Sequence, residues 1–169
     1  MTHGTAKDIA EVVSAAGELV GRTRLQKTVA ILEIAGVGYG FPFEYYKFGP
    51  YSEDLVTSAD RAVALGYVSE EERRAGWGGR YSVYRTDEKQ TTGNSARDAM
   101  IEIARSADAV ALELAVTAAF LAHTGTQDAW REVAHRKPEK VGGSHLTDAK
   151  ALYAKFKQVA EVGENLPQI

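Results

Sequence analysis

The sequence predicts an α+β fold that is mostly helical, and three observations support this prediction. Apolar residues recur at helical spacing over most of the chain. Short segments rich in aromatic and β-branched residues, which are typical of strands, lie within the first 86 residues. The chain has 169 residues, of which 44% are hydrophobic. A chain of this length buries about 70% of the surface that its unfolded form exposes, so a core forms without disulfides or a structural metal.

The composition excludes several classes of protein. The chain has no cysteine, which rules out disulfides, thiolate catalysis and cysteine-ligated zinc or iron–sulfur sites. Its 20 Lys+Arg and 23 Asp+Glu residues give a net charge of −3, which argues against binding nucleic acid through bulk charge. The first residues lack the basic region and apolar run of a signal peptide, and the apolar run 109–122 is shorter than the about 20 residues that span a bilayer. We therefore expect a cytoplasmic protein that binds no membrane.

Two helices and a strand are predicted first. Apolar residues lie at helical spacing over 6–16. The pattern Thr23-Arg-Leu-Gln26 fits a capping box with Thr23 as the N-cap, which predicts a second helix that reaches Ala35. The aromatic segment 43–48 predicts a short strand that ends at Gly49-Pro50.

A third helix and a hairpin follow. Ser52 is a favourable N-cap, and the acidic residues after it suit the first turn of a helix that reaches Leu65. Residues 67–69 and 80–86 predict two strands around a glycine-rich tip. The order helix, helix, short strand, helix, strand, tip, strand is that of a winged helix-turn-helix. We therefore predict a winged-helix domain over residues 1–90, with the hairpin as its wing.

The second half is predicted to be helical. The polar stretch 87–94 is the expected linker, and 95–169 is expected to form a helical extension or a small bundle. The expected helices are 95–106, 108–123, 126–136 and 145–162. Glu113 is the one charge within 109–122, so we expect it at the rim of the core or in a hydrogen-bonded structural role; the alternative is a buried carboxyl group with a raised pKa.

The first half also resembles known bacterial families. Leu25-Gln26-Lys27 opens a helix, and an aromatic strand then runs into Lys47-Phe-Gly-Pro-Tyr-Ser52 and, later, Leu65-Gly-Tyr-Val. Over residues 21–70 this pattern resembles the YwgA-like bacterial proteins of unassigned function and, more distantly, the Panacea-type antitoxin domain. The second resemblance implies a non-enzymatic regulator, an antitoxin or proteolytic adaptor that holds a partner protein.

The motif residues have a structural interpretation as well. Gly49-Pro50 is suited to a sharp turn, and Lys27 or Lys47 can lay its aliphatic stem on aromatic faces with its charge in water. We expect Gly49, Pro50 and Leu25 to maintain the fold. Binding and a merely solvated face are equally expected for the cationic residues Arg22, Arg24, Lys27 and Lys47.

The predicted recognition helix 52–65 is a poor DNA-reading surface. Its exposed side is expected to carry Glu53, Asp54 and Asp60 against Arg61, and carboxylates repel the phosphates of DNA. The wing, 69–85, is more suggestive, because Trp and Arg are frequent binding hot spots and it contains Arg73, Arg74, Trp77, Arg80 and Arg85. The alternative is a solvated hairpin in which Arg73 and Arg74 pair with the neighbouring Glu70, Glu71 and Glu72, which would leave little net charge.

The sequence predicts no enzyme, metal site or cofactor. The repeat Gly36-x-Gly38-x-Gly40 follows a predicted helix rather than a strand, so it lacks the setting of a nucleotide-binding loop. The four histidines have no metal-ligand spacing. The basic cluster 136–140 is expected to be a solvated loop, and contact with phosphate or an acidic partner is the alternative.

The leading hypothesis is a non-enzymatic regulatory module that binds a protein partner of unknown identity. Monomer and homodimer are both left open as its oligomeric state. The alternative is a transcription regulator that reads DNA with helix 52–65 and the wing. The candidate binding residues are Arg22, Arg24, Lys27, Lys47, Tyr51, Arg61, Arg73, Arg74, Trp77 and Arg80.

Overall fold

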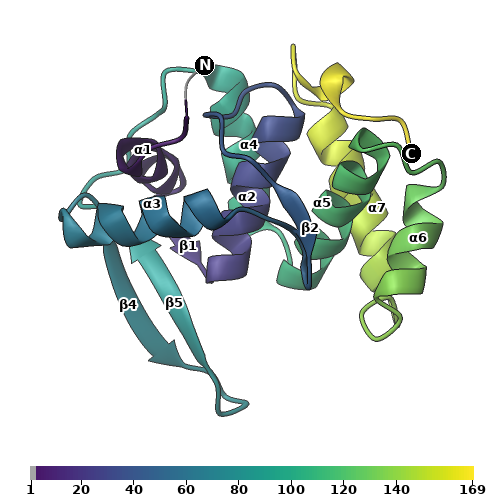
Figure 1. The fold of residues 1–169 in the computed structure, drawn as a ribbon, viewed down its shortest axis with the longest axis horizontal. Helices are drawn as coiled ribbons and strands as arrows, with labels where there is room; N and C mark the ends of the chain where they lie inside the picture. Colours follow the sequence, from purple (N-terminus) through teal and green to yellow (C-terminus); the bar gives the residue numbers. More distant parts are fainter. Residues whose placement is uncertain (1–2) are drawn as a thin grey trace.

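The computed structural model describes residues 3–169, and the fold over this range is α+β, as predicted, with about half of its residues in helices. The elements in order are α1 (Ala6–Ala16), β1 (Glu18–Val20), α2 (Arg22–Ile34), β2 (Glu44–Tyr46), β3 (Gly49–Tyr51), α3 (Glu53–Ala64), β4 (Ser69–Arg74), β5 (Arg80–Arg85), α4 (Ser95–Ser106), α5 (Ala109–His123), α6 (Ala129–Arg136), α7 (His145–Lys157) and the 3₁₀ helix η1 (Gly163–Asn165). Figure 1 shows a helical body with the β4–β5 hairpin projecting from one side.

The strands form two small antiparallel sheets. In the larger sheet the order is β1-β5-β4. The central strand, β5, pairs with β1, which precedes α2, and with β4, the other strand of its hairpin. Leu19 of β1 lies opposite Tyr84 of β5, and both side chains belong to the core. β2 and β3 pair only with each other and form a hairpin between α2 and α3.

Local capping explains several helix boundaries. α1 starts at a capping box in which Thr5 N–H donates to Asp8 Oδ2 at 2.8 Å. At α3 the Ser52 hydroxyl accepts from Leu55 N–H, as predicted. The Asn94 side chain caps α4 in the same way, by accepting from Arg97 N–H.

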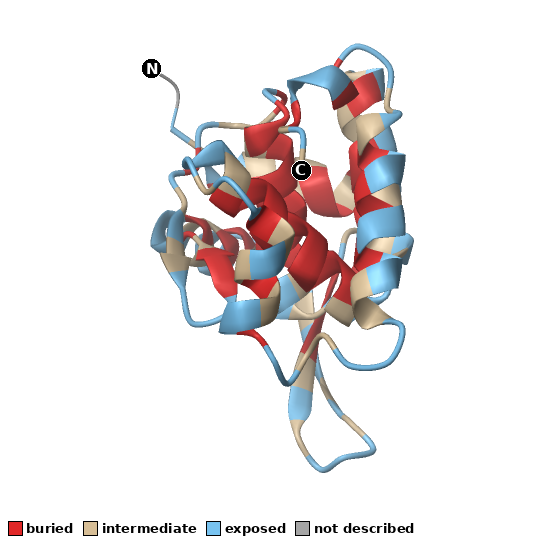
Figure 2. Ribbon diagram, turned by 90° about the vertical axis from the view of Figure 1, so that its right-hand side faces the viewer, coloured by how far each residue is buried: buried red, intermediate tan, exposed pale blue. Residues whose placement is uncertain are grey.

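One hydrophobic core runs through both halves of the chain. α5 is buried over Ala111–Leu121, which explains why it is apolar on all sides. α2 packs against α4 and α5, while α1 packs against α3 and α4. Figure 2 shows the buried residues concentrated on the helices at the centre and the hairpin tip exposed. No helix within residues 3–169 has the length and apolar character needed to cross a membrane.

Several predicted boundaries are wrong. The second helix begins at Arg22, so its N-cap is Gly21 instead of Thr23, and no side chain caps it. Gly49-Pro50 is expected to end the strand 43–48, but it begins a second strand, β3. The turn between β2 and β3 lies at Lys47-Phe48. The strand expected at 67–69 lies at 69–74, and the helices expected at 126–136 and 145–162 cover only 129–136 and 145–157.

Candidate functional site

Two cavities adjoin at the start of α2, on the side of the molecule from which the β4–β5 hairpin projects (Figure 1). The hairpin cavity, of about 360 Å³, lies between the start of α2 and the β4–β5 hairpin. The apolar groove, of about 260 Å³, lies between α2 and α3 and is lined by Leu25, Gln26, Phe48, Tyr51, Leu55, Val56, Ala59, Asp60 and Tyr84. Arg22, Thr23 and Lys27 line both cavities. We call the two cavities with both hairpins the inter-hairpin surface.

Lys27 is buried, with 2% of its surface exposed, so the prediction that its charge lies in water is wrong. Its Nζ donates to the Pro50 carbonyl oxygen at 2.8 Å. Burial lowers the pKa of Lys27 to about 8, the Glu113 carboxylate opposes this shift, and Lys137 and Lys140 add to it. The sequence does not predict this burial because β3 and α5, which enclose α2, are distant in sequence.

The two parts of the sequence motif bind each other. Gln26 Nε2 donates to the Ser52 carbonyl at 2.9 Å, and Ser52 N–H donates to Gln26 Oε1 at 2.9 Å. Lys27 adds its bond to Pro50, and Gly49 lies against Thr117 of α5. The motif therefore connects α2 to the start of α3, which agrees with the structural interpretation of Gly49 and Pro50.

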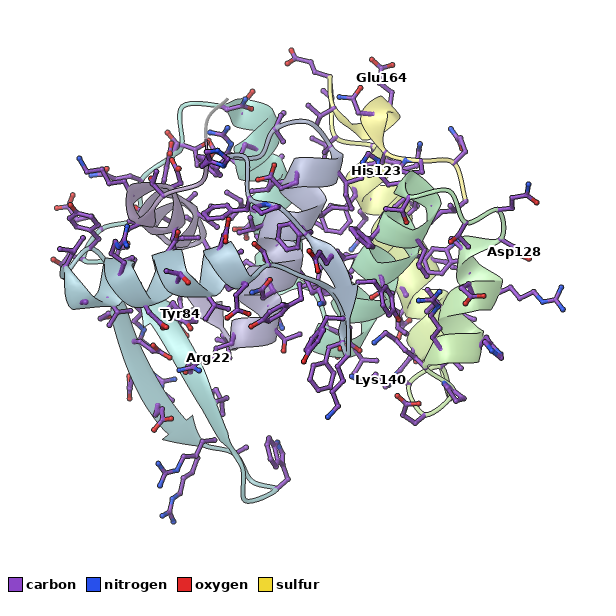
Figure 3. The ribbon with its side chains drawn as sticks, viewed as in Figure 1. Arg22, Tyr84, His123, Asp128, Lys140 and Glu164 are labelled. Atoms are coloured by element: carbon purple, nitrogen blue, oxygen red, sulfur yellow. The ribbon has the colours of Figure 1, made fainter. Side chains whose placement is uncertain are left out.

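Arg22 and Arg24 have different positions. Arg22 is exposed and donates through Nε and Nη2 to Glu70 Oε2, at 3.2 and 2.9 Å. Arg24 donates to the carbonyl oxygens of Val20, Ala104 and Ala107, so it ties the start of α2 to the end of α4. Figure 3 shows Arg22 near Tyr84 at the base of the β4–β5 hairpin. Arg24 is thus a structural residue that also lines the hairpin cavity.

The β4–β5 hairpin carries balanced charges and one exposed aromatic ring. Arg73 pairs with Glu71 at 3.1 Å and Arg80 pairs with Glu72 at 3.3 Å, whereas Glu70 pairs with Arg22 of α2, so the expected pairing is present for Arg73 alone of the two arginines. Trp77 at the tip is 80% exposed. The exposed Arg74 has no ion-pair partner within residues 3–169.

The β2–β3 hairpin presents further aromatic side chains. Tyr46 and Phe48 are 63% and 50% exposed, and the Tyr46 and Tyr51 rings lie 5.4 Å apart. Lys47 Nζ lies 5.7 Å from the centre of the Phe48 ring, and Lys140 Nζ lies 5.4 Å from it. This hairpin therefore combines exposed aromatic rings with positive charge.

The exposed face of α3 is acidic. Glu53, Asp54 and Asp60 are exposed there, as is Arg61, the single cation among the predicted base-reading residues. Arg61 lines neither the hairpin cavity nor the apolar groove. The structure thus separates Arg61 from the other candidate cations at the start of α2.

The cluster 136–140 is only partly solvated, so the prediction of a solvated loop is wrong. Lys137 is buried, and its Nζ lies 3.7 Å from Glu113 Oε2. Lys140 Nζ lies 2.6 Å from the same oxygen. Glu113 is therefore buried in a hydrogen-bonded ion pair, which agrees with its expected structural role, and it draws both lysines onto α5.

Of the aromatic and aliphatic residues of the groove, the sequence predicts only Tyr51 as a binding residue. Leu55 and Ala59 recur at helical spacing on the inner side of α3, a pattern that by itself indicates core packing. Phe48 was noted only as part of an aromatic strand. Within residues 3–169, no group of three His, Asp or Glu side chains is placed to hold a metal ion.

Comparisons with known proteins support a partial relationship. No family model matches the chain, and no solved structure matches it. Over 66 residues the chain is 31% identical to a protein of Bacillus subtilis (strain 168) described as "Uncharacterized protein YwgA". The match covers 39% of this chain and 40% of that protein, so the chain spans well under half of the relative that it matches. This supports a YwgA-like resemblance, whereas the Panacea-type resemblance stays a prediction.

Proposed function

We propose that the chain is a non-enzymatic regulatory module that binds a protein partner through the inter-hairpin surface. The first half is proposed to be a winged helix, in which the β4–β5 hairpin is the wing. The order α1, β1, α2, α3, β4, β5 and the strand order β1-β5-β4 support this proposal, with the β2–β3 hairpin as an insertion between α2 and α3.

The observation that carries the proposal is the set of exposed aromatic side chains on the two hairpins, of which Phe48 lines the apolar groove. Trp77 on the wing and Phe48 and Tyr46 on the β2–β3 hairpin are at least half exposed. Large aromatic residues at such positions are typical anchors of protein interfaces, where burial against a partner stabilises the complex. The regulatory role, antitoxin-like or adaptor-like, follows from the distant Panacea-type resemblance.

A pull-down with the full chain as bait, from a lysate of its native organism, tests the proposal. The double variant Trp77→Ala/Arg74→Ala and the single variant Phe48→Ala should each lose the captured partner, because they remove exposed anchors without entering the core. Arg131→Ala, an exposed arginine on α6, is the matched control and should retain the partner. An unchanged capture by both test variants would remove the inter-hairpin surface from the interface.

DNA binding is the alternative function, and the winged-helix element order favours it. In that case Arg61, Arg73, Arg74 and Arg80 would contact duplex DNA. The acidic face of α3 and the Glu-paired wing arginines oppose it, because they offer few free cations for phosphates. A gel shift at low salt distinguishes the two functions. Tight binding that weakens steeply with added salt would replace the protein-binding proposal, and no shift would exclude the DNA alternative.

A further inference from the structure

The hairpin cavity and the apolar groove differ in chemistry but share one boundary. Aliphatic and aromatic side chains line most of the groove, whereas the hairpin cavity contains Arg22, Arg24, Lys27 and Arg80 with one carboxylate, Glu72. Both cavities meet at the first turns of α2. A ligand bound across this boundary needs an apolar part directly beside an anionic part.

Two of these cations, Arg24 and Lys27, form no ion pair with a carboxylate of the described residues; Glu113, whose charge is felt by Lys27, is itself paired with Lys137 and Lys140. Within residues 3–169, Arg24 and Lys27 donate only to carbonyl oxygens, those of Val20, Ala104 and Ala107 for Arg24 and of Pro50 for Lys27. An ammonium group has three N–H donors, so Lys27 retains donors after its single bond. Arg22 and Arg80 are already paired, with Glu70 and Glu72.

The start of α2 adds backbone donors to the same place. Of the α-helices within residues 3–169, α1 and α3 to α6 have a side-chain cap, whereas α2 follows Gly21 with neither a side-chain cap nor an acidic residue in its first turn. The first N–H groups of a helix have no acceptor within the helix and favour an anion. The carboxylate of Asp60 also lines the groove, so an anionic group is favoured near Thr23 and Lys27 instead of at the Asp60 side.

We propose that the apolar groove binds the carboxyl-terminal residue of a partner chain. The apolar side chain of that residue occupies the groove, and its terminal carboxylate binds the first N–H groups of α2 and the ammonium group of Lys27. This inference rests on the proposed function and specifies which segment of the partner is bound. A terminal residue fits because it carries its side chain and its carboxylate on the same Cα, as the shared boundary requires.

The chain's own terminus is not the occupant within one molecule. Ile169 packs against the core beside Trp130 and Tyr153, near α6 and α7. Figure 1 shows the C-terminus on the opposite side of the helical body from the start of α2. The groove is therefore open to a segment from another chain.

NMR titration of the ¹⁵N-labelled full chain with three short peptides tests the proposal. The probes are acetyl-Gly-Gly-Leu with a free carboxylate, the same peptide as its carboxamide, and acetyl-Gly-Gly-Gly with a free carboxylate. The first should shift the amide signals of Arg22, Thr23 and Val56. The other two should bind about tenfold more weakly or worse, because each lacks one of the two groups that the site recognises. Equal affinity of the first two peptides would overturn the role of the carboxylate.

Matched variants locate the site. Val56→Glu places a charge in the groove and should abolish the shifts, whereas Thr57→Glu places the same charge on the exposed neighbour and should retain them. Lys27→Met should weaken the free-carboxylate peptide at least about tenfold and leave its carboxamide unchanged. If Lys27→Met does not fold, the Val56 and Thr57 pair still decides the location. Retained binding by Val56→Glu would overturn the proposal.

Two further outcomes separate this inference from the proposed function. Octanoate tests whether any amphiphilic carboxylate suffices; affinity equal to that of the leucine peptide would overturn the assignment to a chain end. A captured partner that still binds Val56→Glu but is lost from Trp77→Ala/Arg74→Ala would overturn the inference and leave the proposed function intact. If the leucine peptide binds but Trp77→Ala/Arg74→Ala and Phe48→Ala capture the partner as the wild type does, the groove site is supported and the proposed partner interface is contradicted.

Discussion

The ammonium group of Lys27 is buried inside the protein, and the groups around it belong to β3, to α5 and to the loop after α6. The Pro50 carbonyl of β3 accepts its hydrogen bond, Glu113 of α5 attracts it, and Lys137 and Lys140 after α6 repel it. Burial is the largest influence and lowers its pKa from 10.5 to about 8. Lys27 therefore links the stability of the protein to pH.

We predict that stability rises with pH between about 8 and 10.5 because of Lys27. In this window the unfolded chain binds the proton and the folded chain has released it, so each pH unit adds up to about 1.4 kcal/mol to the free energy of unfolding. Below about pH 8 both states are protonated, and the cost of burial is present in full. Urea unfolding at pH 7 to 10 of the wild type and Lys27→Met measures the effect, which should be absent from the variant.

The exposed Lys47 provides the control for this measurement. Lys47→Met should keep the rise of the wild type, since Lys47 lies on the β2–β3 turn with its side chain in water. Stability curves of Lys27→Met and the wild type that run parallel across the whole pH range would contradict the prediction.

Gly49 illustrates a residue that is required for packing. Its φ is 95°, and a Cβ atom there would lie 2.3 Å from Thr117 Oγ1. Gly66 has a similar φ of 78° but open space around its Cα, so Gly66→Ala should cost only the backbone strain, about 1–2 kcal/mol. Gly49→Ala should cost about 2 kcal/mol more, because the added methyl group overlaps α5. Thermal or urea unfolding of both variants compares these costs.

The Thr117→Ala background checks the cause. It removes the hydroxyl that the new methyl group would strike, so much of the excess cost of Gly49→Ala should disappear there. Equal costs of Gly49→Ala and Gly66→Ala would show that the approach to α5 is unimportant.

Single-residue predictions succeed where the partner is local in sequence. Arg73 pairs with Glu71, two residues before it on β4, and Arg80 pairs with Glu72 across the β4–β5 hairpin, so both partners lie close in sequence. The burial of Lys27 and Lys137 depends on α5, and nothing near either lysine in sequence indicates that contact. For the same reason the sequence alone does not predict the apolar groove.

At the scale of elements, Gln26 connects α2 to the segment between β3 and α3. Its amide group donates to the Ser52 carbonyl and accepts from Ser52 N–H, and the Ser52 hydroxyl caps α3. One side chain thus fixes the entry to a helix that lines the groove.

We predict that Gln26→Leu lowers the free energy of unfolding by about 2–4 kcal/mol, since it leaves two buried backbone groups of Ser52 without partners. Chemical denaturation measures the loss. Gln127→Leu, at an exposed position between α5 and α6, is the control and should change stability little. A Gln26→Leu protein as stable as this control would mean that the Gln26–Ser52 contact contributes nothing.

A capping residue helps to predict where some helices start, although α6, which Asp128 caps, starts at Ala129 and not at the predicted residue 126. α3 and α4 follow Ser52 and Asn94, whose side chains cap them, and their observed bounds lie within one residue of the predicted ones. α2 has no such cap, and its start was misplaced. β1 and β3 have three residues each and are defined by their partner strands, so local propensity could not predict them.

At the scale of the whole molecule, the sequence suggests two segments, 1–90 and 95–169, but the core joins them. α2 is buried from Leu25 to Leu32. The elements that cover it include α4 and α5 from the second segment, and Arg24 donates to the last carbonyls at the end of α4. Removing the second segment would expose this apolar helix and leave the donors of Arg24 without acceptors.

We predict that a fragment of residues 1–94 does not fold by itself. The face of α2 that α4 and α5 cover would become exposed to water. Burial of a large apolar side chain contributes about 1.5–3 kcal/mol, and without this contribution the fragment could not offset the entropy lost on ordering its chain. The ¹⁵N–¹H spectrum of the fragment should therefore show poor dispersion, while the full chain shows a folded pattern. Adding residues 95–169 as a separate chain should restore part of the dispersion, because the two segments share one core. A well-dispersed spectrum of the fragment alone would contradict this prediction and establish the first segment as an independent domain.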